Sequence, residues 1–135
     1  MDEPTTVSGS PAPGAPEVTV AVERRRVDCG EVSLDVHLAG PEDAPLVVML
    51  HGFPESWWSW RHQIAALATR FRVAAPTLRG YGASERPDGV NAYRMDRLVG
   101  DVLGLVILTV VVRMVSEGSV SILDVAVIVL VAVGF

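Results

Sequence analysis

The chain has 135 residues, enough for one modest domain, and a formal net charge of −5 with eleven arginines and no lysine. Its largest basic cluster is Arg24-Arg25-Arg26, which is too small for the broad positive face that phosphate binding needs, so nucleic acid is excluded as a partner. Cys29 is the only cysteine, so no intrachain disulfide is possible, metal-ligand spacing is absent, and a reducing cytoplasm is the expected compartment. We expect no metal and no cofactor.

The first sixteen residues are rich in Pro, Ser, Gly and Ala and show no apolar periodicity. Such a composition cannot bury enough apolar surface to offset the entropy of ordering, so we predict a disordered leader over residues 1–16. The leader has neither the basic nor the apolar region of a secretory signal.

An antiparallel hairpin is predicted next, from residues 17–28 and 32–39, joined by a turn at Cys29-Gly30-Glu31. The second arm alternates apolar with polar side chains, which is typical of a half-buried strand. Its apolar members are Val32, Leu34, Val36 and Leu38.

A short run without alternation, residues 46–50, follows a cluster of turn-forming residues at 40–45. It predicts a strand buried on both faces, as in a parallel sheet. The next residues are His51, Gly52, Phe53 and Pro54. Glycine lets the backbone turn sharply towards a ligand, and proline fixes φ without a competing donor, so this loop can hold an oxyanion.

A helix is predicted over residues 57–70, because Ile64, Ala65, Leu67 and Ala68 form an apolar stripe at helical spacing. Residues 71–84 then resemble a strand followed by a glycine-rich loop with the sequence R-G-Y-G-A-S.

The H-G-F-P and R-G-Y-G-A-S motifs, in this order and spacing, resemble the epoxide-hydrolase branch of the α/β-hydrolase family. The resemblance covers about residues 27–105 and implies an α/β fold: the N-terminal half of an α/β hydrolase, with a β-hairpin followed by the β-α-β-α part of a mostly parallel sheet. We therefore divide the chain into the leader, a partial hydrolase domain at 17–105 and an apolar tail at 106–135. Thr77 departs from the family, where many members carry Asp.

The resemblance also implies roles for individual residues. The Phe53 N–H would donate to the oxyanion hole, while His51, Gly52 and Pro54 hold the loop, and proton transfer by His51 is not expected. Trp57 and Trp58 are candidates for lining the substrate cleft. Four residues would secure the loop after the following strand: Arg79, Gly80, Gly82 and Ser84.

The family's remaining chemistry requires an Asp nucleophile on a tight strand-to-helix elbow, followed by an acid and a base His. All three histidines, at 37, 51 and 62, precede the place of that elbow. Elbows centred on Ser119 or Ser121 lack the small flanking residues that the turn needs. We therefore expect a truncated chain that is inactive alone, since a complete fold needs about twice this length.

The apolar tail is the other departure. Of 27 charged residues, 24 lie in residues 1–101, and nothing after Leu105 resembles the family, so we hypothesise a disrupted reading frame near this point. Alternatively, residues 106–112 could be the fifth strand of the family and 122–133 a buried strand or helix. Membrane insertion is open but not favoured, because no apolar run reaches the roughly 18 to 20 residues of a spanning helix.

Two functions remain. The chain either belongs to a hydrolase that opens an epoxide or a related carbon–leaving-group bond of a small molecule, or it is a non-enzymatic fragment that acts through a partner or membrane contact of its tail. The residues that separate epoxide hydrolases from dehalogenases are not found here. Without a strand beside residues 46–50, that apolar edge would be exposed, and we would expect insolubility without a partner.

Overall fold

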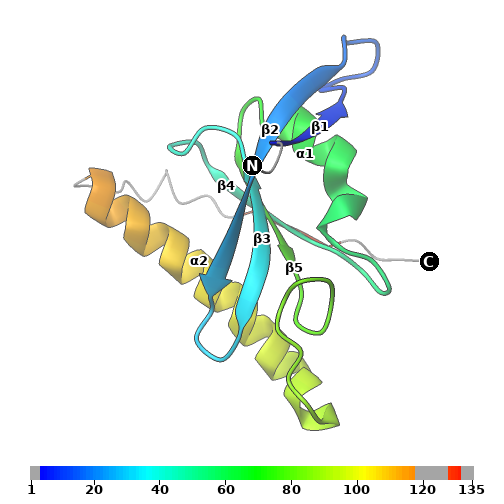
Figure 1. The fold of residues 1–135 in the computed structure, drawn as a ribbon. Helices are drawn as coiled ribbons and strands as arrows, with labels where there is room; N and C mark the ends of the chain where they lie inside the picture. Colours follow the sequence, from blue (N-terminus) through cyan, green and yellow to red (C-terminus); the bar gives the residue numbers. More distant parts are fainter. Residues whose placement is uncertain (1–3, 118–127, 132–135) are drawn as a thin grey trace.

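The computed structural model describes residues 4–117 and 128–131. In these residues a six-stranded sheet, in the order β1-β2-β3-β5-β4-β6, lies between α1 and α2 (Figure 1). The strands are β1 (Thr5–Gly9), β2 (Val18–Asp28), β3 (Ser33–Ala39), β4 (Leu46–Leu50), β5 (Arg72–Thr77) and β6 (Ile128–Val131). The helices are the 3₁₀ turns η1 (Trp57–Trp60) and η2 (Val90–Tyr93) and the α-helices α1 (Arg61–Leu67) and α2 (Met95–Glu117).

Strand β4 is buried on both faces, as its unbroken apolar run predicts. Val47 and Met49 belong to the core on the side of α1, and Leu46 and Val48 to the core that Leu105 of α2 covers. The strand pairs in parallel with β5 and with β6. The expected β-hairpin followed by a β-α-β-α part is therefore confirmed.

The β2–β3 hairpin is confirmed, but the half-buried character predicted for β3 is wrong. Asp35 and His37, on the face expected to be polar and exposed, are only 7% and 6% exposed. The Trp57 ring covers His37, and the Asp35 carboxylate accepts a hydrogen bond from Arg24 at 2.7 Å. Both faces of β3 are thus covered, because segments distant in sequence fold over the polar one.

The prediction of a disordered leader over residues 1–16 is wrong for residues 5–9. Thr5–Gly9 forms β1, which pairs antiparallel with β2 from Thr5↔Val22 to Gly9↔Val18. Strand β2 is eleven residues long and uses Glu23 to Asp28 for β3, so its first half needs another partner. Val7 packs into the core on the α1 side at 3% exposure. That buried contact and the strand pairing order the segment.

The helix predicted for residues 57–70 is divided. Three tryptophans and Ser59 form η1, and only Arg61–Leu67 is α-helical. Ile64 and Ala65 are its buried residues, as the apolar stripe predicts.

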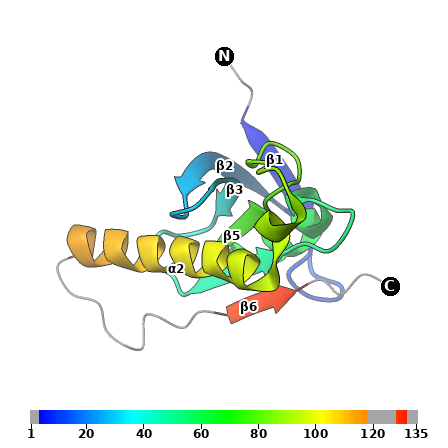
Figure 2. The ribbon, with the colours of Figure 1, turned by 90° about the horizontal axis from the view of Figure 1, so that it is seen from below.

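Of the alternatives for the apolar tail, the one that makes residues 106–112 the fifth strand is wrong, because these residues form part of α2. The strand beside β4 is instead β6, in the register Val47↔Ile128 to Leu50↔Val131. Figure 2 shows α2 lying across one face of the sheet and β6 at the sheet edge. The rest of the predicted 122–133 element lies outside the described residues.

Helix α2 is long and apolar enough over Met95–Ser116 to cross a membrane, although core helices of soluble proteins can have the same length and composition. Only Asp101 and Leu105 are buried among its first 22 residues. The side opposite them exposes apolar residues, including Val99, Leu103 and Ile107. The sheet therefore covers only a narrow strip of this helix.

Candidate oxyanion loop

The loop after β4 is held by the ring of His51, which is 3% exposed. Its Nε2 accepts a hydrogen bond from the Leu78 N–H at 2.9 Å, and its Nδ1 lies 2.9 Å from the Gly52 carbonyl oxygen. Since Nε2 accepts, the proton resides on Nδ1, which donates to Gly52. Both ring nitrogens are occupied by backbone groups, so the geometry is that of a loop support.

Phe53 lies in a tight turn and is largely exposed. The Glu55 N–H donates to the Gly52 carbonyl at 2.9 Å, and a Glu55 carboxylate oxygen accepts from the Gly52 N–H at 3.4 Å. The Phe53–Pro54 peptide bond is cis, and Phe53 is 81% exposed. Within the described part of the chain no acceptor receives the Phe53 N–H. This donor is therefore available to a ligand.

The ring of Tyr81 joins this loop to the glycine-rich loop after β5. It lies edge-on to His51 with centroids 5.1 Å apart and edge-on to Phe53 at 6.4 Å. Together with the His51–Leu78 hydrogen bond, these contacts hold the two sequence motifs against each other.

Internal hydrogen bonds shape the loop after β5. The Ser84 hydroxyl donates to the Thr77 carbonyl at 2.5 Å and accepts from the Asp35 N–H at 2.8 Å. Gly80 has φ +85°, and a Cβ there would lie 2.7 Å from Cε1 of Tyr93; Gly82 has φ +47°. The structure thus places these residues at positions of conformational constraint in the loop.

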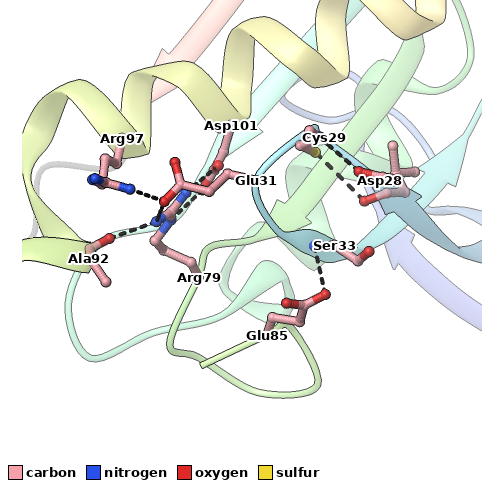
Figure 3. Close-up of polar contacts among 11 residues, drawn as sticks. Asp28, Cys29, Glu31, Ser33, Arg79, Glu85, Ala92, Arg97 and Asp101 are labelled. Carbon is pink, nitrogen blue, oxygen red and sulfur yellow. Dashed lines mark hydrogen bonds and ion pairs between the residues drawn. The ribbon is translucent and has the colours of Figure 1, made fainter. Parts of the chain in front are cut away.

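A buried ion pair connects this loop to α2 (Figure 3). Arg79 is 1% exposed and meets Asp101 in a bidentate contact, Nε to Oδ2 at 2.7 Å and Nη2 to Oδ1 at 2.6 Å. Its Nη1 donates to the Ala92 carbonyl at 2.6 Å. These hydrogen bonds to Asp101 raise the pKa of Arg79. Sequence reasoning missed Asp101, although a single acidic residue entering an apolar run was the available signal.

Two other titratable groups lie near this ion pair. Glu31 contacts Arg97 and Arg79, and the hydrogen bond from Arg97 lowers its pKa. Burial, with the nearby carboxylates of Asp101 and Asp28, raises the pKa of the Cys29 thiol to about 11. The thiol is therefore protonated at neutral pH and is a poor nucleophile.

The tryptophans after the loop divide between packing and surface. Trp57 stacks on His37 of β3, with centroids 3.7 Å apart and planes 8° from parallel. Trp58 is 47% exposed, lies edge-on to Trp57 at 5.3 Å, and carries the Arg61 guanidinium over its ring. Trp58 is thus the more accessible of the two predicted cleft residues.

The other two histidines, His37 and His62, contact other segments of the chain. His37 lies under Trp57, and His62 is exposed with its Nδ1 2.9 Å from the Ser8 carbonyl oxygen. The elbow candidates Ser119 and Ser121 lie outside the described residues. In the described ranges, no group of three or more His, Cys, Asp or Glu residues could hold a metal ion.

Comparison with known proteins identifies the scaffold. A family model described as the alpha/beta hydrolase fold matches residues 45–109. The AB hydrolase superfamily protein YfhM of Bacillus subtilis is 47% identical over 81 residues, 59% of this chain and 28% of that protein. Epoxide hydrolase A of Mycobacterium tuberculosis is 50% identical over 86 residues, 63% of this chain and 27% of its own.

Solved structures agree. An epoxide hydrolase from Vigna radiata superposes with a TM-score of 0.64 at 43% identity, covering 67% of this chain and 28% of that one. Epoxide Hydrolase A from Mycobacterium thermoresistibile gives 0.64 at 44% identity, covering 65% of this chain and 28% of that one.

The described part of the chain is therefore part of an α/β-hydrolase fold. Over about 85 residues it is homologous to epoxide hydrolases, as the two motifs predict. The chain spans about a quarter of the length of the curated relatives it matches.

Proposed function

We propose that this chain supplies the oxyanion-hole part of an epoxide-hydrolase-type site, with the Phe53 N–H as the donor. One observation carries the proposal. The amide lies on a loop locked by His51 and Tyr81, and no group in the described residues accepts its proton. A fixed donor without an internal partner can stabilise charge that develops on a reacting oxygen.

The reaction requires a carboxylate nucleophile, which we place outside the described residues. In the proposed chemistry the carboxylate attacks an epoxide carbon, the C–O bond breaks, and the ring oxygen leaves as an alkoxide that takes up a proton. Water then attacks the carbonyl carbon of the resulting ester, and the Phe53 N–H stabilises the tetrahedral oxyanion. Collapse of this intermediate breaks the acyl C–O bond, expels the diol and regenerates the carboxylate. The described residues support one half of this apparatus.

The sheet register favours a nucleophile after the strand in the position of β6. Strands β4 and β6 are parallel, with Leu50 opposite Val131, so their carboxyl ends lie side by side. In open α/β sheets, ligands bind just beyond the carboxyl ends of the strands. We propose that the chain alone does not turn over epoxides, and that it acts on a small-molecule substrate only as part of a complete site.

A chimera tests this proposal. Residues 18–105 replace the aligned segment of epoxide hydrolase A from Mycobacterium tuberculosis, and hydrolysis of a chromogenic epoxide is measured. We expect an active chimera whose rate falls about 100-fold or more in Phe53→Pro, the usual loss for one oxyanion donor. Phe53→Ala, which keeps the N–H, should retain the rate within a few-fold.

Two outcomes would count against the oxyanion assignment. One is a folded chimera without activity although the parent enzyme is active. The other is an equal loss in Phe53→Ala and Phe53→Pro, which would place the effect in the side chain. Turnover by the purified 135-residue chain itself, abolished by Phe53→Pro, would refute only the statement that it is inactive alone.

The exposed apolar side of α2 favours a second candidate, a non-enzymatic fragment that acts by contact with a partner or a membrane. For this candidate we propose a cytoplasmic protein whose tail contacts other surfaces. Flotation with phospholipid vesicles and light scattering distinguish the cases. Co-flotation that Ile107→Glu abolishes supports membrane contact, whereas a monodisperse monomer that does not float excludes both membrane contact and self-association.

A further inference from the structure

A cavity of about 190 Å³ lies between the second half of α2 and the beginning of the parallel strands. Its apolar wall includes Leu46 of β4 and Leu105 and Leu108 of α2. An apolar cavity of about 150 Å³ accommodates one benzene ring, so this space is large enough for a ligand of six to eight carbon atoms.

The same cavity is lined by charged groups. Arg25, Arg72, Arg113 and Glu42 contribute to its wall. Glu23 balances Arg25, which it meets at 2.6 Å, and its second oxygen lies 3.9 Å from Arg72. Three guanidinium groups therefore face two carboxylates, so one positive charge is left uncompensated within this cluster.

Two of these guanidinium groups are held in place by backbone carbonyls. Arg72, whose side chain is 12% exposed, donates from Nη1 to the Gly40 carbonyl at 2.8 Å. Arg113 donates from Nη2 to the Ala44 carbonyl at 2.7 Å. Each guanidinium has five N–H donors, so further donors remain for a ligand. Burial lowers the pKa of Arg72, and the charges of Arg25 and Arg113 act in the same direction.

We propose that this cavity binds a small apolar carboxylate, with its head group at Arg72 and Arg113 and its hydrocarbon part against Leu46, Leu105 and Leu108. A monoanion supplies the one missing negative charge, and the apolar wall favours an alkyl or aryl group over water.

This site is separate from the oxyanion loop. Leu46 and Arg72 begin β4 and β5, whereas His51 follows the end of β4. At roughly 3.3 Å per residue, the five residues of β4 put the two sites about 16 Å apart, at opposite ends of the strands. Binding here does not depend on the proposed hydrolase chemistry.

Titration of the full chain with hexanoate, followed by calorimetry and ligand-observed NMR, tests the proposal. Hexan-1-ol, with the same hydrocarbon chain and no charge, is the matched ligand control. We expect hexanoate to bind saturably and more tightly than hexanol, and Arg113→Gln to weaken it about tenfold, the equivalent of about 1.4 kcal/mol. Arg94→Gln, which removes the same charge just before α2, should leave the affinity unchanged.

Leu108→Trp provides an independent test, because it fills the cavity without changing charge. It should abolish hexanoate binding while the circular dichroism spectrum stays that of the parent. The proposal fails if hexanoate does not bind saturably, if hexanol binds equally well, or if Arg94→Gln and Arg113→Gln weaken binding to the same extent. If Arg113→Gln does not fold, Arg72→Gln takes its place and should weaken hexanoate binding, and Leu108→Trp should still abolish it.

Discussion

The imidazole of His51 accepts the Leu78 N–H at 2.9 Å, and this hydrogen bond joins the loop after β4 to the loop after β5 across 27 residues of sequence. The ring also donates to Gly52, so it links the two loops from the inside. The arrangement explains how a histidine in a hydrolase-type motif can act as a structural support.

Replacing His51 by Ala should destabilise the fold by about 1–3 kcal/mol, because the partly buried Leu78 N–H loses its acceptor and the buried imidazole is removed. Urea denaturation gives the change in the free energy of unfolding, and amide hydrogen exchange should show faster exchange at Leu78. His62→Ala, at an exposed position, should change the stability by about 0.5 kcal/mol or less. Unchanged protection at Leu78 in His51→Ala would contradict the assigned hydrogen bond.

The Arg79–Asp101 pair should behave as a buried unit. Asp101→Asn leaves a buried guanidinium without its charge partner and should cost about 3–5 kcal/mol in unfolding free energy. The double variant Arg79→Met/Asp101→Leu should be more stable than the sum of its two single variants, as measured by a denaturation cycle. Strict additivity would show that the two side chains do not interact.

Gly80 and Gly89 offer a matched pair, with φ values of +85° and +87°. Alanine is strained at both positions, at a cost of about 1 kcal/mol or more. Only at Gly80 would the new Cβ meet another side chain, at 2.7 Å from Tyr93. We therefore expect a lower melting temperature for Gly80→Ala than for Gly89→Ala, and equal values would exclude the close approach to Tyr93.

His37 should make the stability depend on pH. Burial lowers its pKa in the folded state below the ordinary value of 6.5. Below pH 6.5 the unfolded chain therefore binds a proton that the folded chain does not, so stability is complete above this pH and decreases as the pH falls towards the folded pKa.

Denaturation at pH 7.5 and 5.5 measures the effect, with His37→Phe as the control that keeps an aromatic ring against Trp57. The stability lost by the parent between the two pH values should exceed the loss in the variant. An identical loss in both proteins would mean that His37 does not titrate differently in the two states.

The Cys29 thiol should react slowly. A pKa near 11, against an ordinary value of 9.0, lowers the thiolate fraction about 100-fold at pH 8. Alkylation by iodoacetamide, followed by mass spectrometry, should be slow in the folded chain and fast in urea. A folded-state rate equal to that in urea would contradict the buried environment.

Much of the scaffold was predictable because its signals are local. Residues 46–50 are apolar on both faces, and the following glycine and proline mark the loop whichever segments surround it. The His51 and Tyr81 contacts could be anticipated only as a family resemblance, since they join residues far apart in sequence.

Strand β1 and the buried face of β3 were missed because both depend on distant partners. Thr5–Gly9 has one apolar side chain that becomes buried, and it is a strand because the first half of β2 needs a neighbour. The Val-rich residues 106–112 have a high intrinsic β-propensity, but they continue a helix whose buried residues are Asp101 and Leu105. Tertiary context decided these elements.

Gly104 lets α2 approach the hairpin turn so closely that a Cβ there would lie 2.4 Å from the Cys29 carbonyl oxygen. One turn before Gly104, Asp101 binds Arg79, which lies in the loop after β5. Tyr81 of that loop contacts Phe53 in the loop after β4. The helix has 23 residues and is about 34 Å long, and Gly104 lies near its middle. The contacts with the hairpin turn and with the loop after β5 thus come from the first half of α2, whereas the second half carries exposed apolar side chains, including Ile107, Val111 and Val115.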